Sequence, residues 1–434
     1  MEKDFQRILD RMTKAGLDVD KMPRRDFVKV AAGMVGLSAT LAACGGSGGN
    51  SGPALQQWYH QYGEAGTQQA VFKYAKGYTK ANVKVQWTAG DFGTKLSAAL
   101  VAPGGGPDIY EGGPSLAAVK ANQITDLSDL YTPDVKSDYT DTILNSLTVN
   151  GKIYGVKMVT DTGVLYYRKS MLQKAGVQPP TTFDEVIAAA KQLTSGNVKG
   201  IFVGNDGGIG ALQGLALWSA GHGNDFIVNN KIAFDNDRTA LAFTKMRELA
   251  KSNAVLLGSP TDWFDPSAFT QGLAAMQWTG LWAMPAIIKA LGDDFDVVPW
   301  PALDSQGIPT TFLGGWAEMV NGKSKYIDQA KAFVKWLWID NVADQQDFNL
   351  DYGFHVPPRK SIAAKATKLQ SGPAAKAVQY LDQYARYTSP LWDANMATAL
   401  NNAVSNIVKN GADAKTEVHN AAQQANAELQ KILS

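Results

Sequence analysis

Three carboxylate side chains are spaced so that they could place hydrogen-bond acceptors around a bound molecule. Glu64, Asp91 and Glu111 each follow a short segment with strand character. A carboxylate in such a loop can accept hydrogen bonds from ligand hydroxyl groups, or it can simply be solvated. The four histidines are scattered and lack metal-ligand spacing. We therefore predict neither a metal nor a cofactor.

The elements that would position these carboxylates alternate between strand and helix. Residues 54–59 and 83–87 predict short strands, and residues 68–80 carry apolar positions at helical spacing. A Gly/Pro-rich loop at 103–107 leads into a further strand at 108–110. This alternation predicts parallel βαβ units in an α/β fold. Because ligands bind beyond the carboxyl ends of such strands, we expect the three carboxylates at one edge of the sheet.

Two helices further along the chain have clear local signals. Thr182 is a suitable N-cap, and Glu185 three residues later completes a capping box, so a helix should start here and end near Gly196. Residues 327–339 predict an amphipathic helix.

Composition limits the classes of protein and partner. The chain has 434 residues, of which 45% are hydrophobic and 19% charged, an ordinary globular balance. At roughly 100–200 residues per domain, two or three domains are expected. The 41 basic and 40 acidic residues give a net charge of +1, which argues against a nucleic-acid partner. A single cysteine excludes an internal disulfide and a cysteine-rich metal site.

The N-terminal segment has the features of an export signal. The apolar stretch from Phe27 to Ala43 contains Lys29 and is shorter than the ~20 apolar residues that a bilayer span needs. Arg24 and Arg25 precede it directly, in a pattern that resembles the twin-arginine export signature, although Pro23 replaces the usual Ser or Thr. We predict a signal peptide over residues 1–43, with export by the general secretory route as the alternative.

Cys44 ends this segment. The sequence Leu41-Ala42-Ala43-Cys44 resembles a bacterial lipobox, in which the cysteine is acylated and becomes the new N-terminus. The alternative is a buried cysteine in an N-terminal helix. Residues 44–53 are rich in Gly and Ser and should act as a flexible tether. We expect the protein to be anchored to the outer face of the cytoplasmic membrane through lipid on Cys44.

Four sequence blocks, in order, suggest a family. The blocks lie at residues 154–186, at residues 272–282, at Gly314-Gly315-Trp316 and in the segment that begins at Trp392. Together they resemble the extracellular solute-binding proteins of ABC importers, the sugar-binding family 1 that includes maltose-binding protein. The resemblance covers nearly the whole chain after the tether.

The resemblance implies a two-lobed α/β fold of the periplasmic-binding-protein type (type II), with a hinge and a ligand cleft between the lobes. Lobe one would comprise residues 54–159 and 306–358, and lobe two residues 160–305 and 359–434. Pro357-Pro358 would mark one crossing between them.

The implied function is a receptor that captures a di- or oligosaccharide by hinge closure and delivers it to an ABC importer permease. Such a receptor does no chemistry and is expected to be monomeric, with the permease on separate chains. Two alternatives remain: a secreted carbohydrate-active hydrolase, and a binding protein for glycerol phosphate or another small metabolite.

The resemblance also implies aromatic ligand contacts. Trp282 and Trp392 fall where the family stacks sugar rings, and Trp316 follows a glycine pair in a loop that points into the cleft. Trp278 is a weaker candidate, with a core residue at strand spacing from Gly280 as the alternative. Most of the eleven tryptophans should be core residues, because large aromatic side chains usually fill the lobes.

Three smaller residues complete the predicted site. Gly280 would let the backbone approach the ligand closely, and Gly315 would shape the loop before Trp316. Asp161 aligns with a carboxylate that binds sugar hydroxyl groups, although a turn-capping role near the hinge is an equal alternative.

Overall fold

The computed structural model describes residues 52–64 and 66–434. The predicted export signal with Arg24 and Arg25, the predicted lipidation site Cys44 and most of the tether lie outside the described residues. Residues 51–434 form one compact unit. In the described part of the chain, no helix combines the length and apolar character that a membrane crossing requires.

The sheet of lobe one contains the three strands predicted from the N-terminal half. Its order is β2-β1-β3-β14-β6, and β1 runs parallel to both β2 and β3 as expected. β14 comes from a distant part of the sequence and pairs antiparallel with β3 and β6. The strands are β1 (Ala54–His60), β2 (Asn82–Thr88), β3 (Ile109–Gly112), β6 (Val156–Lys157) and β14 (Ala317–Val320).

Helices and one hairpin surround this sheet. α3 buries Val71 and Tyr74 in the same apolar core as Leu55 of β1. The helices are α3 (Thr67–Gly77), α4 (Phe92–Val101), α5 (Leu116–Lys120), α6 (Pro133–Ser137), α7 (Asp141–Ser146), α14 (Ile327–Lys335), α15 (Val342–Gln346) and α16 (Lys360–Ala363), and the hairpin strands are β4 (Thr148–Val149) and β5 (Lys152–Ile153). The predicted amphipathic helix begins at Ile327 as expected.

The sheet of lobe two is mixed. Its order is β12-β7-β11-β8, with β11 parallel to β8 and antiparallel to β7. The strands are β7 (Gly163–Tyr167), β8 (Lys199–Phe202), β11 (Ala274–Gly280) and β12 (Asp296–Val298). Two short pairs lie outside this sheet: β9 (Ile227–Val228) with β10 (Lys231–Ile232), and β13 (Thr311–Phe312) with β15 (Ala385–Arg386).

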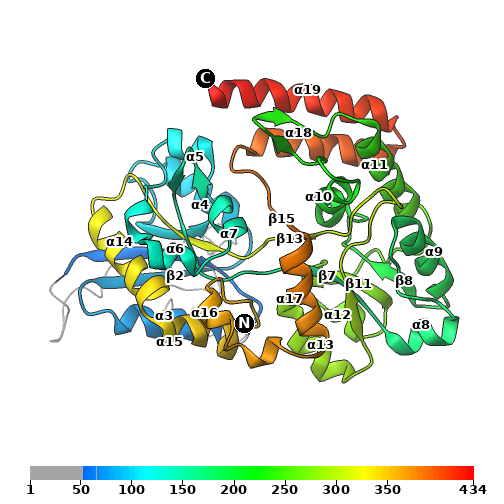
Figure 1. Cartoon of the computed structure of the whole chain (residues 1–434), viewed down its shortest axis with the longest axis horizontal. Helices are drawn as coiled ribbons and strands as arrows, with labels where there is room; N and C mark the ends of the chain where they lie inside the picture. The colour runs from blue at the N-terminus through cyan, green and yellow to red at the C-terminus, as the bar shows by residue number, and fades with distance from the viewer. Residues whose placement is uncertain (1–51, 65) are drawn as a thin grey trace, which may run out of the picture. The chain divides into compact units, whose positions relative to one another are not determined.

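The helices of lobe two enclose a second core, and Figure 1 shows α18 and α19 side by side with α10 and α11 next to them. The predicted capping box is confirmed, because Thr182 and Glu185 cap the start of α9 reciprocally. The helices are α8 (Lys169–Ala175), α9 (Phe183–Leu193), α10 (Ile209–Ser219), α11 (Asp237–Ala250), α12 (Ser267–Thr270), α13 (Met284–Leu291), α17 (Gly372–Tyr384), α18 (Ala394–Ser405) and α19 (Ala414–Leu433).

Three chain segments lie side by side between the two sheets. Thr160 pairs with Val356, and Asp161 pairs with Gly314. After Pro357-Pro358 the chain stays against lobe one, because Arg359 Nε donates to Asp138 Oδ2 at 2.7 Å. We predicted that lobe two resumes at Arg359, but α16, which directly follows Arg359, contacts lobe one.

Candidate functional site

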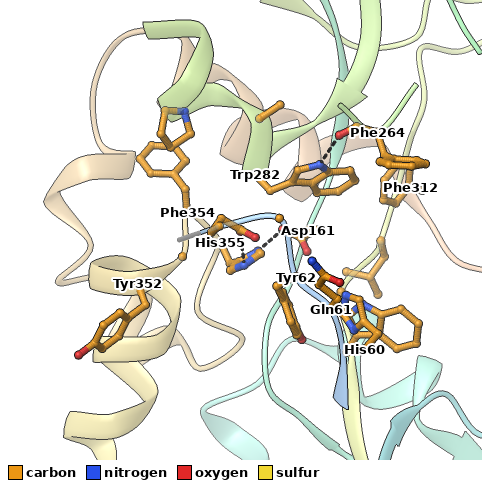
Figure 2. A pocket seen from close by; sticks show the side chains of 18 of the residues that line it. His60, Gln61, Tyr62, Asp161, Phe264, Trp282, Phe312, Tyr352, Phe354 and His355 are labelled. Carbon is orange, nitrogen blue, oxygen red and sulfur yellow. Dashed lines mark hydrogen bonds and ion pairs between the residues drawn. The ribbon is translucent and has the colours of Figure 1, made fainter. Parts of the chain in front are cut away.

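A cavity of about 1630 Å³ lies where the two sheets and the crossing segments meet. This volume exceeds the ~300–1,000 Å³ typical of small-molecule sites. Lobe one contributes His60, Tyr62, Glu64 and Trp316, lobe two contributes Trp263, Phe264 and Trp282, and the crossing segments contribute Asp161, Phe312 and His355. Figure 2 shows how the labelled members of this set face the same space.

Trp282 is one of three tryptophans that line the cavity, with Trp263 and Trp316. Its indole Nε1 donates to the carbonyl oxygen of Phe264 at 2.9 Å (Figure 2), and its ring meets Trp263 edge-on at 6.1 Å between centroids. A Cβ on Gly280 would come within 1.9 Å of the Trp282 ring. We predicted that Gly280 lets the backbone approach the ligand, but Gly280 does not line the cavity. Its missing side chain instead makes room for the Trp282 ring.

Trp316 is the tryptophan that lobe one contributes to the cavity. The His60 ring packs against it at 4.6 Å between centroids, with the two ring planes tilted by 35°. Gly315, directly before it, has a φ of +79° and packs so closely that a Cβ would lie 2.2 Å from the Val159 carbonyl oxygen. The Gly315 carbonyl accepts a hydrogen bond from Lys157 Nζ at 2.9 Å. These contacts fix the loop that presents Trp316, and both Gly315 and Trp316 line the cavity as predicted.

Glu111 lies behind the cavity wall and does not line it. The side chain is 0% exposed because β3 extends to Gly112 and keeps Glu111 within the sheet. Its Oε2 accepts hydrogen bonds from the backbone N–H and ring Nδ1 of His60 at 2.8 and 2.7 Å, and its Oε1 accepts one from the Tyr62 hydroxyl. We expected Glu111 to contact the ligand. Instead it supports His60 and Tyr62, which line the cavity.

Glu318 of β14 lies next to Glu111 in the strand register and was not predicted. Its side chain is fully buried, and its Oε1 accepts a hydrogen bond from Gln57 Nε2 at 3.0 Å. Burial, with the nearby charge of Glu111 as the second cause, raises the pKa of Glu318 to about 8. A neutral carboxylic acid therefore lies beneath the lobe-one wall at neutral pH.

Glu64 and Asp161 line the cavity and share one partner. His355 Nδ1 lies 2.7 Å from Asp161 Oδ1 (Figure 2), and its Nε2 lies 2.8 Å from Glu64 Oε1. The second contact has the distance of an ion pair but not the alignment of a hydrogen bond. Burial acts to raise the pKa of Glu64, but the charge of His355 outweighs it and holds that pKa below its ordinary value. Sequence reasoning missed His355, because no motif surrounds it.

Lys157 adds a cation to the cavity lining. Its side chain lies near Asp161 and is buried at 7% exposure. Burial lowers the pKa of Lys157 to about 8, although the charge of Asp161 opposes this shift. Together with His355, it offsets the two carboxylates.

Comparison with known proteins identifies the family. Residues 69–377 match the bacterial extracellular solute-binding proteins. The chain belongs to this family. The two-lobed fold, its hinge and the cleft between the lobes agree with that assignment.

Relatives of this solute-binding protein extend over most of its length. It is 25% identical to the galactooligosaccharide-binding protein of Bacillus subtilis over 416 residues, 91% of this chain and 95% of the relative. It is 26% identical to the arabinooligosaccharide-binding protein of the same organism, over 69% of this chain and 73% of the relative. A solute-binding protein of Thermotoga lettingae, solved with α-D-tagatose, has a similar fold, with a TM-score of 0.72, 20% identity and coverage of 87% and 100%.

Three other predicted residues of this solute-binding protein lie outside the main cavity. Asp91 is exposed and caps α4 by accepting a hydrogen bond from the Thr94 N–H at 3.0 Å. Trp278 is 0% exposed and packs edge-on against Trp300 in the lobe-two core. Trp392 is half-buried against Phe226. The cap of α4 therefore determines the position of Asp91, and aromatic packing determines the positions of the two tryptophans.

Trp278 and Trp392 nevertheless line a second, smaller cavity of about 360 Å³. This side cavity shares Trp263, Phe312 and Thr388 with the main one, so the two adjoin. Two buried polar atoms among its lining residues, Trp278 Nε1 and Gln213 Oε1, have no hydrogen-bond partner among residues 52–64 and 66–434. The wall of the side cavity therefore contains a buried donor and a buried acceptor among its aromatic residues.

Proposed function

We propose that this solute-binding protein is a lipid-anchored extracytoplasmic receptor that captures a di- or oligosaccharide and delivers it to the permease of an ABC importer. The observation that carries the proposal is the composition of the main cavity. Two tryptophans from opposite lobes, Trp282 and Trp316, share it with the carboxylates of Glu64 and Asp161.

This combination suits the surface of a sugar. The C–H faces of a pyranose ring stack on an indole, while its hydroxyl groups need hydrogen-bond partners after they leave water. Carboxylates are strong acceptors for such hydroxyl groups. Closure of the hinge would bring the Trp282 and Trp316 platforms toward the same ligand.

Capture without chemistry is part of the proposal. A glycoside hydrolase needs one carboxyl group as a proton donor and a second as a nucleophile or base, ~5–9.5 Å apart. Glu64 and Asp161 are both engaged by His355, which favours a fixed acceptor role for each. His355 and Lys157 offset the charges of these two carboxylates, and a cluster without a surplus of positive charge favours an uncharged ligand over a phosphate ester.

A ligand of two or more sugar rings fits the space best. The main cavity is larger than typical small-molecule sites, and the side cavity adds a further aromatic compartment. The oligosaccharide names of the two Bacillus relatives support the same ligand class. Lipid on Cys44 would keep the receptor near its permease, and a Cys44→Ala variant should then be released into the medium or periplasm in soluble form.

A thermal-shift screen tests the proposed ligand class. The panel contains monosaccharides, arabino- and galactooligosaccharides, maltooligosaccharides and glycerol phosphate, with Trp282→Ala as the matched variant. We expect stabilisation by at least one oligosaccharide, and its loss in Trp282→Ala. Stabilisation by glycerol phosphate alone would overturn the carbohydrate assignment, and turnover of any oligosaccharide would overturn the receptor role.

A further inference from the structure

His355 is a buried ionisable group in the cavity lining whose position has a specific consequence. It is 2% exposed and lies on the crossing segment that pairs with Thr160. Its ring lies between the carboxylates of Asp161 and Glu64, at 2.7 and 2.8 Å. Glu64 belongs to the loop that follows β1, whereas Asp161 belongs to another crossing segment. The ring therefore joins lobe one to the hinge.

The two contacts determine how many protons the cluster holds. A neutral imidazole has one N–H and one bare nitrogen, and a bare nitrogen is an acceptor. An acceptor that faces a carboxylate oxygen at this distance is repelled, so both short contacts require a proton. Burial acts to lower the pKa of His355, but Asp161 and Glu64 outweigh it and raise the pKa to about 10. The ring is therefore an imidazolium at neutral pH.

The other polar groups around the ring are compatible with this charge. Tyr62 meets it edge-on at 6.0 Å between centroids, and burial raises the pKa of Tyr62 well above its usual value, so its hydroxyl stays neutral. His60 acts on Glu64 from lobe one, and Lys157 acts on Asp161 from β6. The imidazolium and the two carboxylates carry a net charge of −1, which Lys157 offsets when it is protonated.

The main chain holds the ring from behind. The backbone N–H of His355 donates to the Asn349 carbonyl at 3.0 Å, and Val356 exchanges two hydrogen bonds with Thr160, each 2.9 Å long. The ring folds back over Gly353, where a Cβ would lie 2.4 Å from His355 Cδ2. A residue larger than glycine at position 353 would displace the ring.

We propose that His355 is a positioning residue of the ligand site, which holds Glu64 and Asp161 in place as paired acceptors for the hydroxyl groups of the ligand. The inference rests on the proposed carbohydrate function for its ligand, but its geometry is independent of that function. Each carboxylate meets His355 through one oxygen, and the second oxygen of each would be the acceptor for the ligand. Because imidazolium occupies the first oxygen, neither carboxylate needs to be reordered when a sugar binds.

The first test needs no ligand. The chain has four histidines, so ¹⁵N-histidine labelling gives a simple NMR spectrum, and His355→Gln assigns the His355 signals. We expect both ring nitrogens of His355 to be protonated at pH 7.5 and to remain so up to about pH 9. One protonated and one bare nitrogen at pH 7.5 would overturn the imidazolium.

The second test measures binding by titration calorimetry with the arabino- and galactooligosaccharides. His355→Gln and Gly353→Ala should each weaken binding at least tenfold at pH 7.5, while His222→Gln, at an exposed histidine, should leave it unchanged. The charge of His355 does not change between pH 6 and 8.5, so the measurements at pH 7.5 compare the variants with a wild type in which His355 is fully charged.

The outcomes separate the two proposals. Full affinity in His355→Gln with only a lower melting temperature would show a structural role and overturn the positioning role. If Gln at this position prevents folding, Gly353→Ala decides together with the ¹⁵N spectrum. Because Gly353 itself lines the cavity, weaker binding supports the positioning role only where the His355 signals change as well, and weaker binding with unchanged His355 signals would overturn it. If no carbohydrate binds the wild type, the proposed function and the ligand part of this inference fail together, and the NMR result still decides the charge of His355.

Discussion

Glu318→Gln tests the buried acid beneath the lobe-one wall. The pKa of Glu318 is about 8 in the folded chain, against 4.5 for an ordinary glutamate. Between pH 4.5 and pH 8 the folded state therefore keeps a proton on Glu318 that the unfolded state has lost. Stability should therefore fall as the pH rises from 4.5 to 8 and level off above 8. At ~1.4 kcal/mol per pH unit, the loss over the three units between pH 5 and pH 8 is about 4 kcal/mol. Glutamine keeps the shape and does not titrate, so Glu318→Gln should lack this loss.

Differential scanning calorimetry of both proteins at pH 5 and pH 8 measures the effect. With roughly 2 °C of melting temperature per kcal/mol for a chain of this size, the melting temperature of the variant relative to wild type should rise by about 8 °C between pH 5 and pH 8. Glu248→Gln, at an exposed position on α11, serves as the control and should show a small, constant difference. Parallel melting curves for wild type and Glu318→Gln across this range would refute the reasoning.

Three further substitutions probe the cavity. Gly280→Ala places a methyl group 1.9 Å from the Trp282 ring and should weaken oligosaccharide binding about tenfold or more by calorimetry, whereas Gly77→Ala, with ordinary space around it, should not. Trp278→Phe removes an unpartnered N–H from the side cavity and should weaken binding of longer oligosaccharides more than that of monosaccharides. Glu111→Gln removes the charged acceptor of two wall residues and should lower both affinity and melting temperature, each by the equivalent of about 1–3 kcal/mol. Equal losses for all ligand lengths in Trp278→Phe would place its effect in the core instead.

The elements that the sequence predicted correctly are those with local causes. The alternation of residues 83–87 depends only on neighbouring side chains, and the capping box at Thr182 and Glu185 spans one helical turn. β14 has no such signal, because it enters the lobe-one sheet from about 200 residues away in sequence. Its position between β3 and β6 depends on tertiary contacts, which the local sequence does not reveal.

The carboxylates show why a strand boundary matters for a site. Glu64 and Glu111 both seemed to lie just past a strand, but β3 extends to Gly112 and places Glu111 within the ladder opposite Glu318. An error of two residues in the strand end thus converts an expected ligand contact into a buried support. His355 could not be predicted for another reason: its two carboxylate partners lie 194 and about 290 residues away in the sequence.

The site is organised so that protein groups hold its polar atoms before a ligand arrives. Glu111 is engaged by His60 and Tyr62, and the shared imidazolium engages Glu64 and Asp161. Ordering a flexible side chain on binding costs ~0.5–1.5 kcal/mol each, and groups that are already fixed avoid this cost. Hydroxyl groups of a ligand then meet acceptors of set direction, so that specificity depends on the positions of those hydroxyl groups more than on net charge. A ligand whose hydroxyl groups are inverted at one carbon would leave a fixed carboxylate without its donor and should bind more weakly.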